Sequence, residues 1–328
     1  MVDVQTMDAI PRKKNVTADE FFKDHLAGSR PVIFTGEMSD WNAVGKWTLE
    51  HLEQHGSRNV QVEYYPSGNR SDAFNYVSMT LGEYIHRVRT EPEKRTQYYL
   101  AERPVESILP ESTQVVEDAP RREDLQPLSF LGDDANAKAT KMVFVGVDTF
   151  STAHYHRSTS QAVLCQVQGR KRLRMIPPSS MKHMYLLPWY SMRGNHSRIR
   201  FDGESEPDPR DFPKLAQAEM LECTLEPGEA LFIPDHWMHI VEGIEENISV
   251  TYFWDSDWRQ AHLPGVIRDS ASAAIKSVMV GVAGLSSKLG TNRLLVDCAS
   301  MVGVVGKEDR EAILHHLEEF GAKRPHEQ

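Results

Sequence analysis

The sequence predicts a mainly β protein with flanking helices, in which residues 141–255 form a sandwich or jelly-roll barrel. Three observations support this class. Six short β-branched or aromatic runs follow one another, turn residues separate several of them, and no helical pattern alternates with the strands as it would in a doubly wound sheet. The expected strands are 141–146, 162–168, 171–176, 222–225, 230–233 and 248–254.

Two turn signals divide this core. Gly169-Arg170 lies between two expected strands and predicts a tight hairpin, and Pro227-Gly228 predicts a second turn. The stretch 179–218 is polar and irregular, so we expect an insertion over one mouth of the barrel.

Residues 1–140 are expected to be an N-terminal helix and strand region that is integrated with the barrel. Thr17 and Thr48 stand where N-caps of short helices are expected, Glu20 completes a capping-box pattern, and a further helix is expected over 80–88. β-Branched and aromatic runs predict strands at 30–35, 59–65 and 97–101.

The stretch 102–140 carries several prolines and many charges without a sustained period. We interpret it as a long surface excursion with one helical turn. It is either a flap that faces the substrate or a solvated connection, and the sequence favours neither.

The last part of the chain, 256–328, is expected to be a C-terminal helical segment. Residues 266–289 are rich in Ala, Val, Ser and Gly, and 307–320 form an amphipathic pattern with Ile313, Leu317 and Phe320 on one side. These helices can pack on the same subunit or form a homodimer.

Composition narrows the class of protein. The 328 residues carry 37 Lys+Arg and 47 Asp+Glu, a net charge of −10, so no global positive field would attract nucleic acid. We read the widely spaced Cys165, Cys223 and Cys298 as buried apolar residues. Because neither a signal peptide nor a membrane-spanning run is visible, we expect no membrane association and a cytoplasmic location.

Three histidines form the candidate metal site. His154 and His156 are separated by one residue, so in a strand their side chains project to the same face. His239 follows an apolar strand that Pro234 ends, which places it at a barrel rim. Three converging imidazoles would suit iron, copper, nickel or zinc. The alternative is that these are ordinary surface or core histidines.

Lys171 is the second candidate group. It begins an expected strand, and an inward side chain would place an ammonium inside an apolar barrel, which requires an anionic partner. No acidic residue of its own strand offers one, so a bound anion is the attractive answer. The alternative is an exposed lysine within the basic run 170–174.

Several ordered motifs together resemble the JmjC-type cupin proteins, in particular the branch of the asparaginyl hydroxylase that acts on hypoxia-inducible factor. The resemblance covers roughly residues 15–255. It includes the similar lead-in Arg30-Pro-Val-Ile-Phe-Thr-Gly36 with Trp41 and Trp47. The core motifs are His154-Tyr-His156, Gln166-Val-Gln-Gly-Arg-Lys-Arg172 with Pro177-Pro178, Glu226-Pro-Gly-Glu-Ala-Leu-Phe-Ile-Pro-Asp-His-Trp-Met-His239 and Val250-Thr-Tyr-Phe-Trp254.

The resemblance implies a double-stranded β-helix that holds Fe(II) by two histidines and a carboxylate, with 2-oxoglutarate chelating the metal. His154 and His239 fall on the family's first and last ligands, and Lys171 falls on the lysine that meets the far carboxylate of 2-oxoglutarate. Tyr99 and Ser151 fall where the family places hydroxyls that assist this lysine.

One position departs from the family pattern. The family motif is HxD or HxE, and here His156 occupies the carboxylate position, which removes one negative charge from the site. Counting back from Lys171 without a gap would instead make His156 the first ligand and leave Ser158 at the carboxylate place. We prefer His154 and His156, because Ser151-Thr-Ala-His-Tyr matches the family better.

The resemblance implies that O2 and 2-oxoglutarate react at the ferrous centre to give succinate and CO2 while a C–H bond is oxidised. We expect hydroxylation of a peptide, a protein side chain or an amino-acid-like metabolite, with N-demethylation as the less favoured reaction. Two alternatives stay open. One is a three-histidine oxygenase or oxidase that uses no 2-oxoglutarate, and the other is a non-catalytic binding protein.

Overall fold

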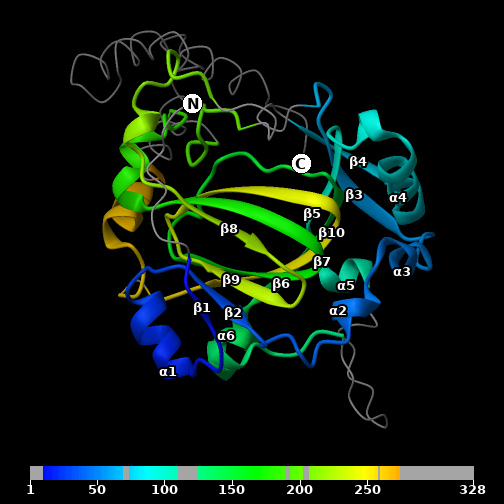
Figure 1. Ribbon diagram of the computed structural model, residues 1–328, viewed down its shortest axis with the longest axis horizontal. Helices are drawn as coiled ribbons and strands as arrows, with labels where there is room; N and C mark the ends of the chain where they lie inside the picture. Colours follow the sequence, from blue (N-terminus) through cyan, green and yellow to red (C-terminus); the bar gives the residue numbers. More distant parts are fainter. Residues whose placement is uncertain are drawn as a thin grey trace, which may run out of the picture. The chain divides into compact units, whose positions relative to one another are not determined.

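The computed structural model describes residues 10–68, 74–109, 124–188, 193–201, 207–257 and 259–273 (Figure 1). The chain divides into two compact units, Met1–Val266 and Ile267–Gln328. The first unit holds a large sheet and the surrounding helices, so the predicted mainly β class is confirmed. The predicted C-terminal helices beyond residue 273 lie outside the described residues.

One ten-stranded sheet organises the first unit, in the order β1-β2-β9-β7-β10-β6-β5-β3-β4, with β8 paired to β7. Strand pairing is antiparallel except between β1 and β2. The strands are β1 Arg12–Lys13, β2 Val32–Thr35, β3 Asn59–Tyr64, β4 Asn75–Thr80, β5 Tyr98–Pro104, β6 Thr140–Val147, β7 Ser160–Ile176, β8 Leu221–Leu225, β9 Glu229–Ile233 and β10 Met238–Asp255.

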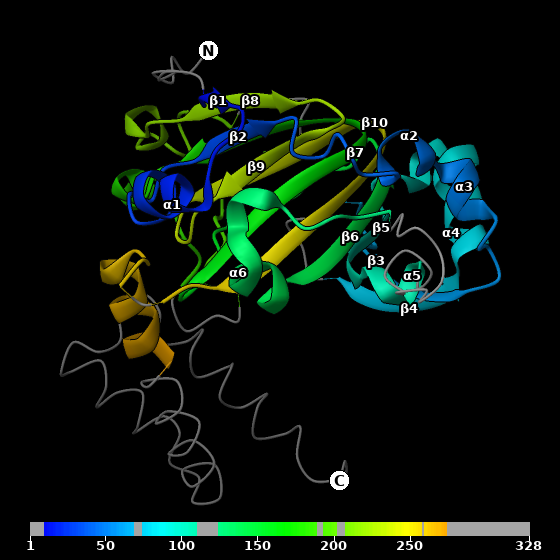
Figure 2. The ribbon, with the colours of Figure 1, turned by 90° about the horizontal axis from the view of Figure 1, so that it is seen from below.

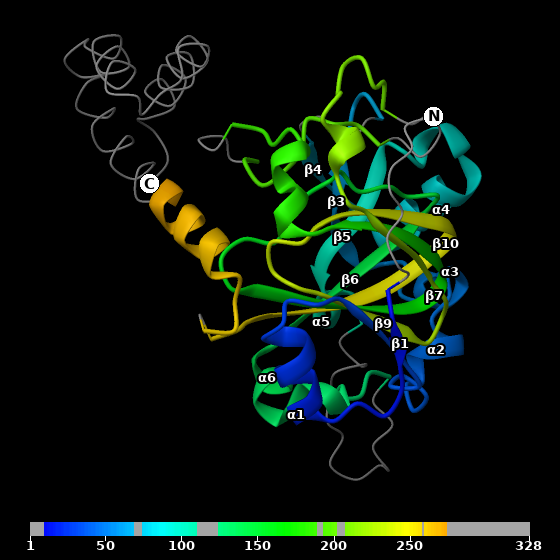
Figure 3. The same cartoon turned by 60° about the vertical axis from the view of Figure 1, so that its left-hand side comes forward.

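The two long strands β7 and β10 run side by side and belong to both layers of the fold (Figure 3). The first half of β7 pairs with β9, and its second half pairs with β8. Side chains from both halves, such as Leu164 and Leu173, pack in one buried cluster with Leu225 and Ile233. The two layers therefore face each other across an apolar interior, as in a jelly roll.

The predicted hairpin at Gly169-Arg170 is wrong, because β7 continues through it. Gly169 has a φ of +67°, and a Cβ there would lie 2.0 Å from the carbonyl oxygen of Glu246. The pairing register shifts at the same place, between Ile244 and Ile248 of β10. The left-handed glycine thus bends the ribbon from one layer to the other beside a bulge and does not reverse the chain. The turn predicted at Pro227-Gly228 is present between β8 and β9.

Short helices cover the sheet (Figure 2). The predicted caps at Thr17 and Thr48 are confirmed, and Thr80 caps α4 as well: the three hydroxyls accept hydrogen bonds from backbone N–H groups in the first turns that follow. The helices are α1 Ala18–Glu20, the π-helix Phe21–Leu26, α2 Ala43–Lys46, α3 Leu49–Glu53, α4 Leu81–Thr90, α5 Val105–Ile108, α6 Gly132–Lys138, four 3₁₀ turns at Pro92–Lys94, Ser129–Leu131, Pro178–His183 and Leu215–Gln217, and a helix over 263–273.

The stretch 124–138 is not the surface excursion that the sequence predicts. Leu128 and Phe130 are fully buried, and the Phe130 ring stacks on Phe34 of β2 at 3.7 Å between centroids. Asp124 accepts hydrogen bonds from Lys46 and from Trp47 Nε1. The segment has few apolar residues among many charged ones, so its sequence pattern did not indicate burial. In the structure it completes the core between the sheet and the N-terminal helices.

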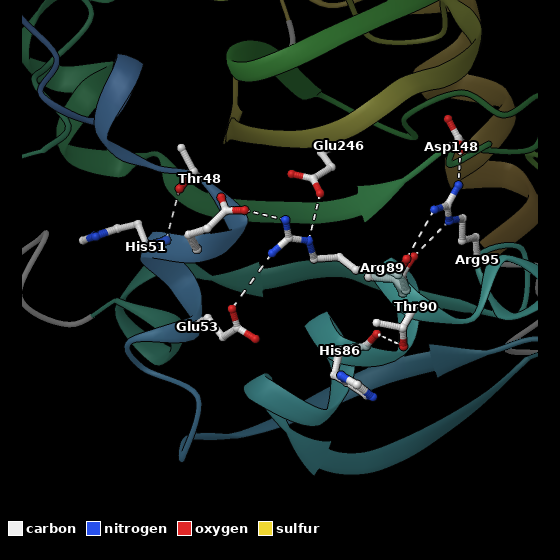
Figure 4. A network of polar contacts seen from close by, with 11 residues as sticks. Thr48, His51, Glu53, His86, Arg89, Thr90, Arg95, Asp148 and Glu246 are labelled. Carbon is white, nitrogen blue, oxygen red and sulfur yellow. Dashed lines mark hydrogen bonds and ion pairs between the residues drawn. The ribbon is translucent and has the colours of Figure 1, made fainter.

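A polar network ties the helical layer to the bulge in β10 (Figure 4). Arg89 of α4 reaches Glu50 and Glu53 of α3, and its Nε lies 3.0 Å from Glu246 Oε1. The Asp148 carboxylate accepts from Arg95 and from the backbone N–H of Glu245. Ion pairs therefore hold the bend in the long strands at the outer surface. Within the described part of the chain, no helix combines the length and apolarity that crossing a membrane would require.

Candidate metal centre

The structure brings the three predicted histidines together. One nitrogen atom of each of His154, His156 and His239 lies within 4.8 Å of the others. His239 is the second residue of β10, and its backbone forms a bridge with His154, with N···O distances of 2.8 and 3.1 Å in the two directions. This bridge joins the segment after β6 to β10, so convergence comes from strand pairing and not from local sequence.

Hydrogen bonds orient two of the three rings. Nδ1 of His154 lies 2.7 Å from the carbonyl oxygen of Thr152, and Nδ1 of His239 lies 3.0 Å from that of Trp237. A carbonyl only accepts, so each Nδ1 carries the proton and each Nε2 keeps a lone pair. Among the described residues, the buried Nδ1 of His156 has no hydrogen-bond partner.

Burial keeps the imidazoles neutral. Loss of hydration lowers the pKa of His154, lowers that of His239 strongly, and lowers the pKa of His156 to about 3. The neighbouring imidazoles add to the effect at His156 and His239. Neutral imidazole is the form that binds metal ions. The described cluster contains nitrogen donors and no carboxylate.

A cavity of about 510 Å³ opens onto these rings. Apolar side chains from both layers, including Leu164, Ile233 and Phe253, line its wall. His196, Asn195 and Arg193 of the predicted insertion over the barrel mouth line it as well. The His196 ring stacks on His154 with 5.3 Å between centroids. The sequence pointed to the insertion but to no residue within it.

Lys171 lies inside the same cavity and is only 2% exposed. Its Nζ contacts the Ser249 hydroxyl and lies 5.3 Å from the centroid of the Phe144 ring. Burial lowers the pKa of the Lys171 ammonium to about 7. The side chain therefore points inward, as the sequence predicts, and the described residues supply its ammonium with no carboxylate partner.

Tyr99 and Ser151 also line the cavity. The Ser151 hydroxyl accepts a hydrogen bond of 3.0 Å from the Val241 N–H, which pins the chain near His239. The hydroxyl that contacts the Lys171 ammonium belongs to Ser249, which sequence reasoning missed. The signal was present, because Ser249 and Thr251 alternate with apolar residues in β10 and share its inward face.

The structure also bears on the alternative alignment that counts back from Lys171. Ser158 is exposed, with a φ of +58°, and it is not among the described residues that line the cavity. The third member of the cluster that contains His156 and His239 is His154. The geometry therefore favours the pair His154 and His156 over the pair His156 and Ser158.

A family model and several known proteins match most of this chain. The model of the cupin-like domain matches residues 18–260. The chain is 30% identical to lysine-specific demethylase 8 of Xenopus tropicalis over 251 residues, which are 75% of this chain and 53% of that protein. It is 26% identical to the Jumonji C domain-containing protein 5 of Drosophila melanogaster, over 75% of this chain and 60% of that protein. It is likewise 26% identical to the tRNA wybutosine-synthesizing protein 5 of Gallus gallus, over 80% of each.

The chain thus spans only about half to three fifths of the demethylase and the Jumonji protein. These relatives support the JmjC and cupin resemblance as a whole, and they do not support a place in the branch of the asparaginyl hydroxylase. Since the match extends from the N-terminal helices to the end of β10 and encloses the cavity with its three histidines, this chain belongs to the cupin-like JmjC family.

Proposed function

We propose that this protein is an Fe(II)- and 2-oxoglutarate-dependent oxygenase. His154, His156 and His239 hold the iron, and Lys171 binds the far carboxylate of 2-oxoglutarate. One observation carries the proposal: three neutral imidazoles line the same cavity as a buried ammonium that pairs with no described carboxylate, although Glu63 and Glu102 also line that cavity. Each of these features is costly in an apolar interior unless a ligand completes it.

The donor set fits a ferrous ion. Imidazole nitrogen suits Fe(II), and the orphaned Nδ1 of His156 marks a buried polar atom that the described residues leave unsatisfied. A bound iron would supply the activation of O2, coupled to oxidative decarboxylation of 2-oxoglutarate. The lack of a carboxylate leaves the site one negative charge poorer than the family pattern.

The chain's own residues would bind and orient the cosubstrate. The Lys171 ammonium pairs with a carboxylate, and this contact raises its pKa again from about 7. Ser249 fixes the position of the ammonium, and Tyr99 and Ser151 are proposed to assist from the cavity wall. The apolar wall excludes water from the reacting groups.

The substrate is proposed to be a peptide, a protein side chain or an amino-acid-like metabolite. One relative is named as a lysine-specific demethylase, which supports a protein substrate, and another is named for a tRNA modification. The net charge of −10 favours protein or small molecule over nucleic acid here. Hydroxylation is the proposed reaction, and demethylation would begin with oxidation of a C–H bond in the same way.

The test is binding followed by turnover. Purified protein should form succinate from 2-oxoglutarate only when Fe(II) and O2 are present. Lys171→Ala should weaken 2-oxoglutarate binding by about 100-fold or more while metal binding stays intact, because it removes the buried cation. His239→Ala should lose the metal. Lys138→Ala, on an exposed face of α6, is the matched control. Unchanged 2-oxoglutarate affinity in Lys171→Ala would contradict the proposal.

A second candidate is a three-histidine metal oxygenase that uses no 2-oxoglutarate, and the all-nitrogen donor set favours it. Spectroscopic signs of an oxoacid chelated to the metal would exclude this candidate. A non-catalytic binding protein would be purified without metal and would gain no stability from added Fe(II).

A further inference from the structure

A second buried polar cluster lies beside the three histidines and has no part in the proposed chemistry. Asp235 and His236, in the loop between β9 and β10, are 1% and 0% exposed. Asp235 Oδ2 lies 3.2 Å from Nδ1 of His236 and accepts a hydrogen bond of 2.8 Å from the N–H of His262. The Asp235 N–H donates to Gln161 Oε1 at 3.0 Å. This loop is therefore held from several sides.

His236 contacts the metal-binding segment twice. Its backbone N–H donates to the carbonyl oxygen of His156 at 3.1 Å, and its ring stacks on Tyr155 with 5.3 Å between centroids and 26° between planes. Tyr155 lies between His154 and His156, so its packing helps to set the rotation of the segment. Asn195 also holds Tyr155. The backbone N–H of Tyr155 donates to the carbonyl oxygen of Asn195 at 3.1 Å, and Nδ2 of Asn195 donates to the carbonyl oxygen of Tyr155 at 2.8 Å.

The backbone of His236 adopts a φ of +59°, in the left-handed region that favours glycine or asparagine. Strain of this kind persists only where the surroundings enforce it, and it concentrates at functional sites. A glycine would meet the backbone requirement without strain. A histidine at this position therefore calls for a reason other than the backbone, and the stacking of its ring on Tyr155 supplies one.

Gly265 packs directly against the His236 ring. A Cβ at this position would lie 2.3, 2.4 and 2.5 Å from Cδ2, Nε2 and Cγ of His236. Gly265 stands in the first turn of the helix over 263–273, where alanine is intrinsically the better helix former. Close packing against His236 thus explains why this position needs a glycine.

We infer that His236, which packs against both Tyr155 and Gly265, is a positioning residue for the metal centre, and that the first turn of the helix over 263–273 acts on metal binding through it. The inference rests on the proposed function in one respect, namely that His154, His156 and His239 bind a metal. It assigns to the start of the C-terminal helical segment a role in holding the site.

The experiment titrates metal-free full-length protein with Co(II) and records both the affinity and the visible absorption bands. Gly265→Ala should weaken Co(II) binding by about tenfold and shift the bands, because the added methyl displaces the His236 ring. His236→Asn tolerates the left-handed backbone and removes the ring, and it should also change the bands. Ser270→Ala, exposed on the same helix, is the matched control and should change neither.

The double variant separates a positioning role from a general loss of stability. In the His236→Asn background, Gly265→Ala should cost no further affinity, since the ring it would displace is gone. Equal losses from Gly265→Ala in both backgrounds, or unchanged Co(II) bands in His236→Asn, would overturn the inference. If Gly265→Ala fails to fold, the Co(II) absorption bands of His236→Asn alone test the inference. Wild-type protein that binds no Co(II) would contradict the proposed metal centre itself, which distinguishes the two failures.

Discussion

Two cations, one in the outer helical layer and one in the interior, differ in whether carboxylates accompany them. Arg89, in the outer helical layer, is one-third exposed and lies within 4.0 Å of carboxylates from Glu50, Glu53 and Glu246. Lys171, in the interior, is 2% exposed, and the contact that its Nζ makes with an oxygen is to the Ser249 hydroxyl. The exposed cation is accompanied by its counter-charges, whereas no described carboxylate pairs with the interior ammonium, and the proposed 2-oxoglutarate would take that place.

The largest expected difference between these two cations is in stability without ligand. Lys171→Met should raise the free energy of unfolding of the metal-free protein, on the order of 3 kcal/mol, because it removes a buried ammonium and keeps the apolar stem. Chemical denaturation at pH 7 measures the change. A variant less stable than wild type would mean that the Lys171 ammonium has a partner in the protein and would remove the argument for an anionic ligand.

The same comparison predicts a pH dependence. The pKa of Lys171 is about 7 in the folded protein against an ordinary value of 10.5, so above pH 7 the unfolded chain binds more protons than the folded one. Stability therefore rises with pH, by up to about 1.4 kcal/mol per unit from this group. Between pH 7 and 9, wild type should gain relative to Lys171→Met. Above that range the buried thiols of Cys165 and Cys223, whose pKa burial raises, act in the opposite direction. Parallel stability curves for the two proteins would refute the assignment.

The smallest effect is expected at Arg89. Arg89→Met should lower the free energy of unfolding by about 1 kcal/mol or less, since its ion pairs are partly exposed and screened. The loss should shrink further in about 1 M salt, and 2-oxoglutarate binding should not change. Thermal unfolding at two salt concentrations checks this. A loss of several kcal/mol would show that the bend in β10 depends on this network.

Local patterns were reliable where the structure is decided locally. The caps at Thr17 and Thr48 are confirmed because a hydroxyl and the N–H two or three residues later meet through backbone geometry alone. The strands 59–65 and 141–146 are confirmed within a residue at each end. The errors lie where tertiary packing overrides the local signal. Gly169 can supply a left-handed residue to a hairpin or to a bend, and its approach to Glu246 selects the bend.

The same limit applies to the site. The spacing of His154 and His156 and the inward alternation of Ser249 can be read from sequence, because a strand repeats every two residues. Ser249 was missed because nothing in its own strand says that Lys171 lies across the interior. His196 and His236 were missed for the same reason, since their partners come from other segments.

The amino-acid sequence alone therefore determined the class of fold, the limits of several strands such as β3, β6, β8 and β9, and the three histidines and the lysine that line the cavity. Only the tertiary structure decided that His239 pairs with His154, that Lys171 finds a hydroxyl in place of a carboxylate, and that Gly265 presses on His236. Backbone propensity acts over a few neighbouring residues. The meeting of these groups depends instead on the register of β7 against β10 and on the packing of both layers around one cavity.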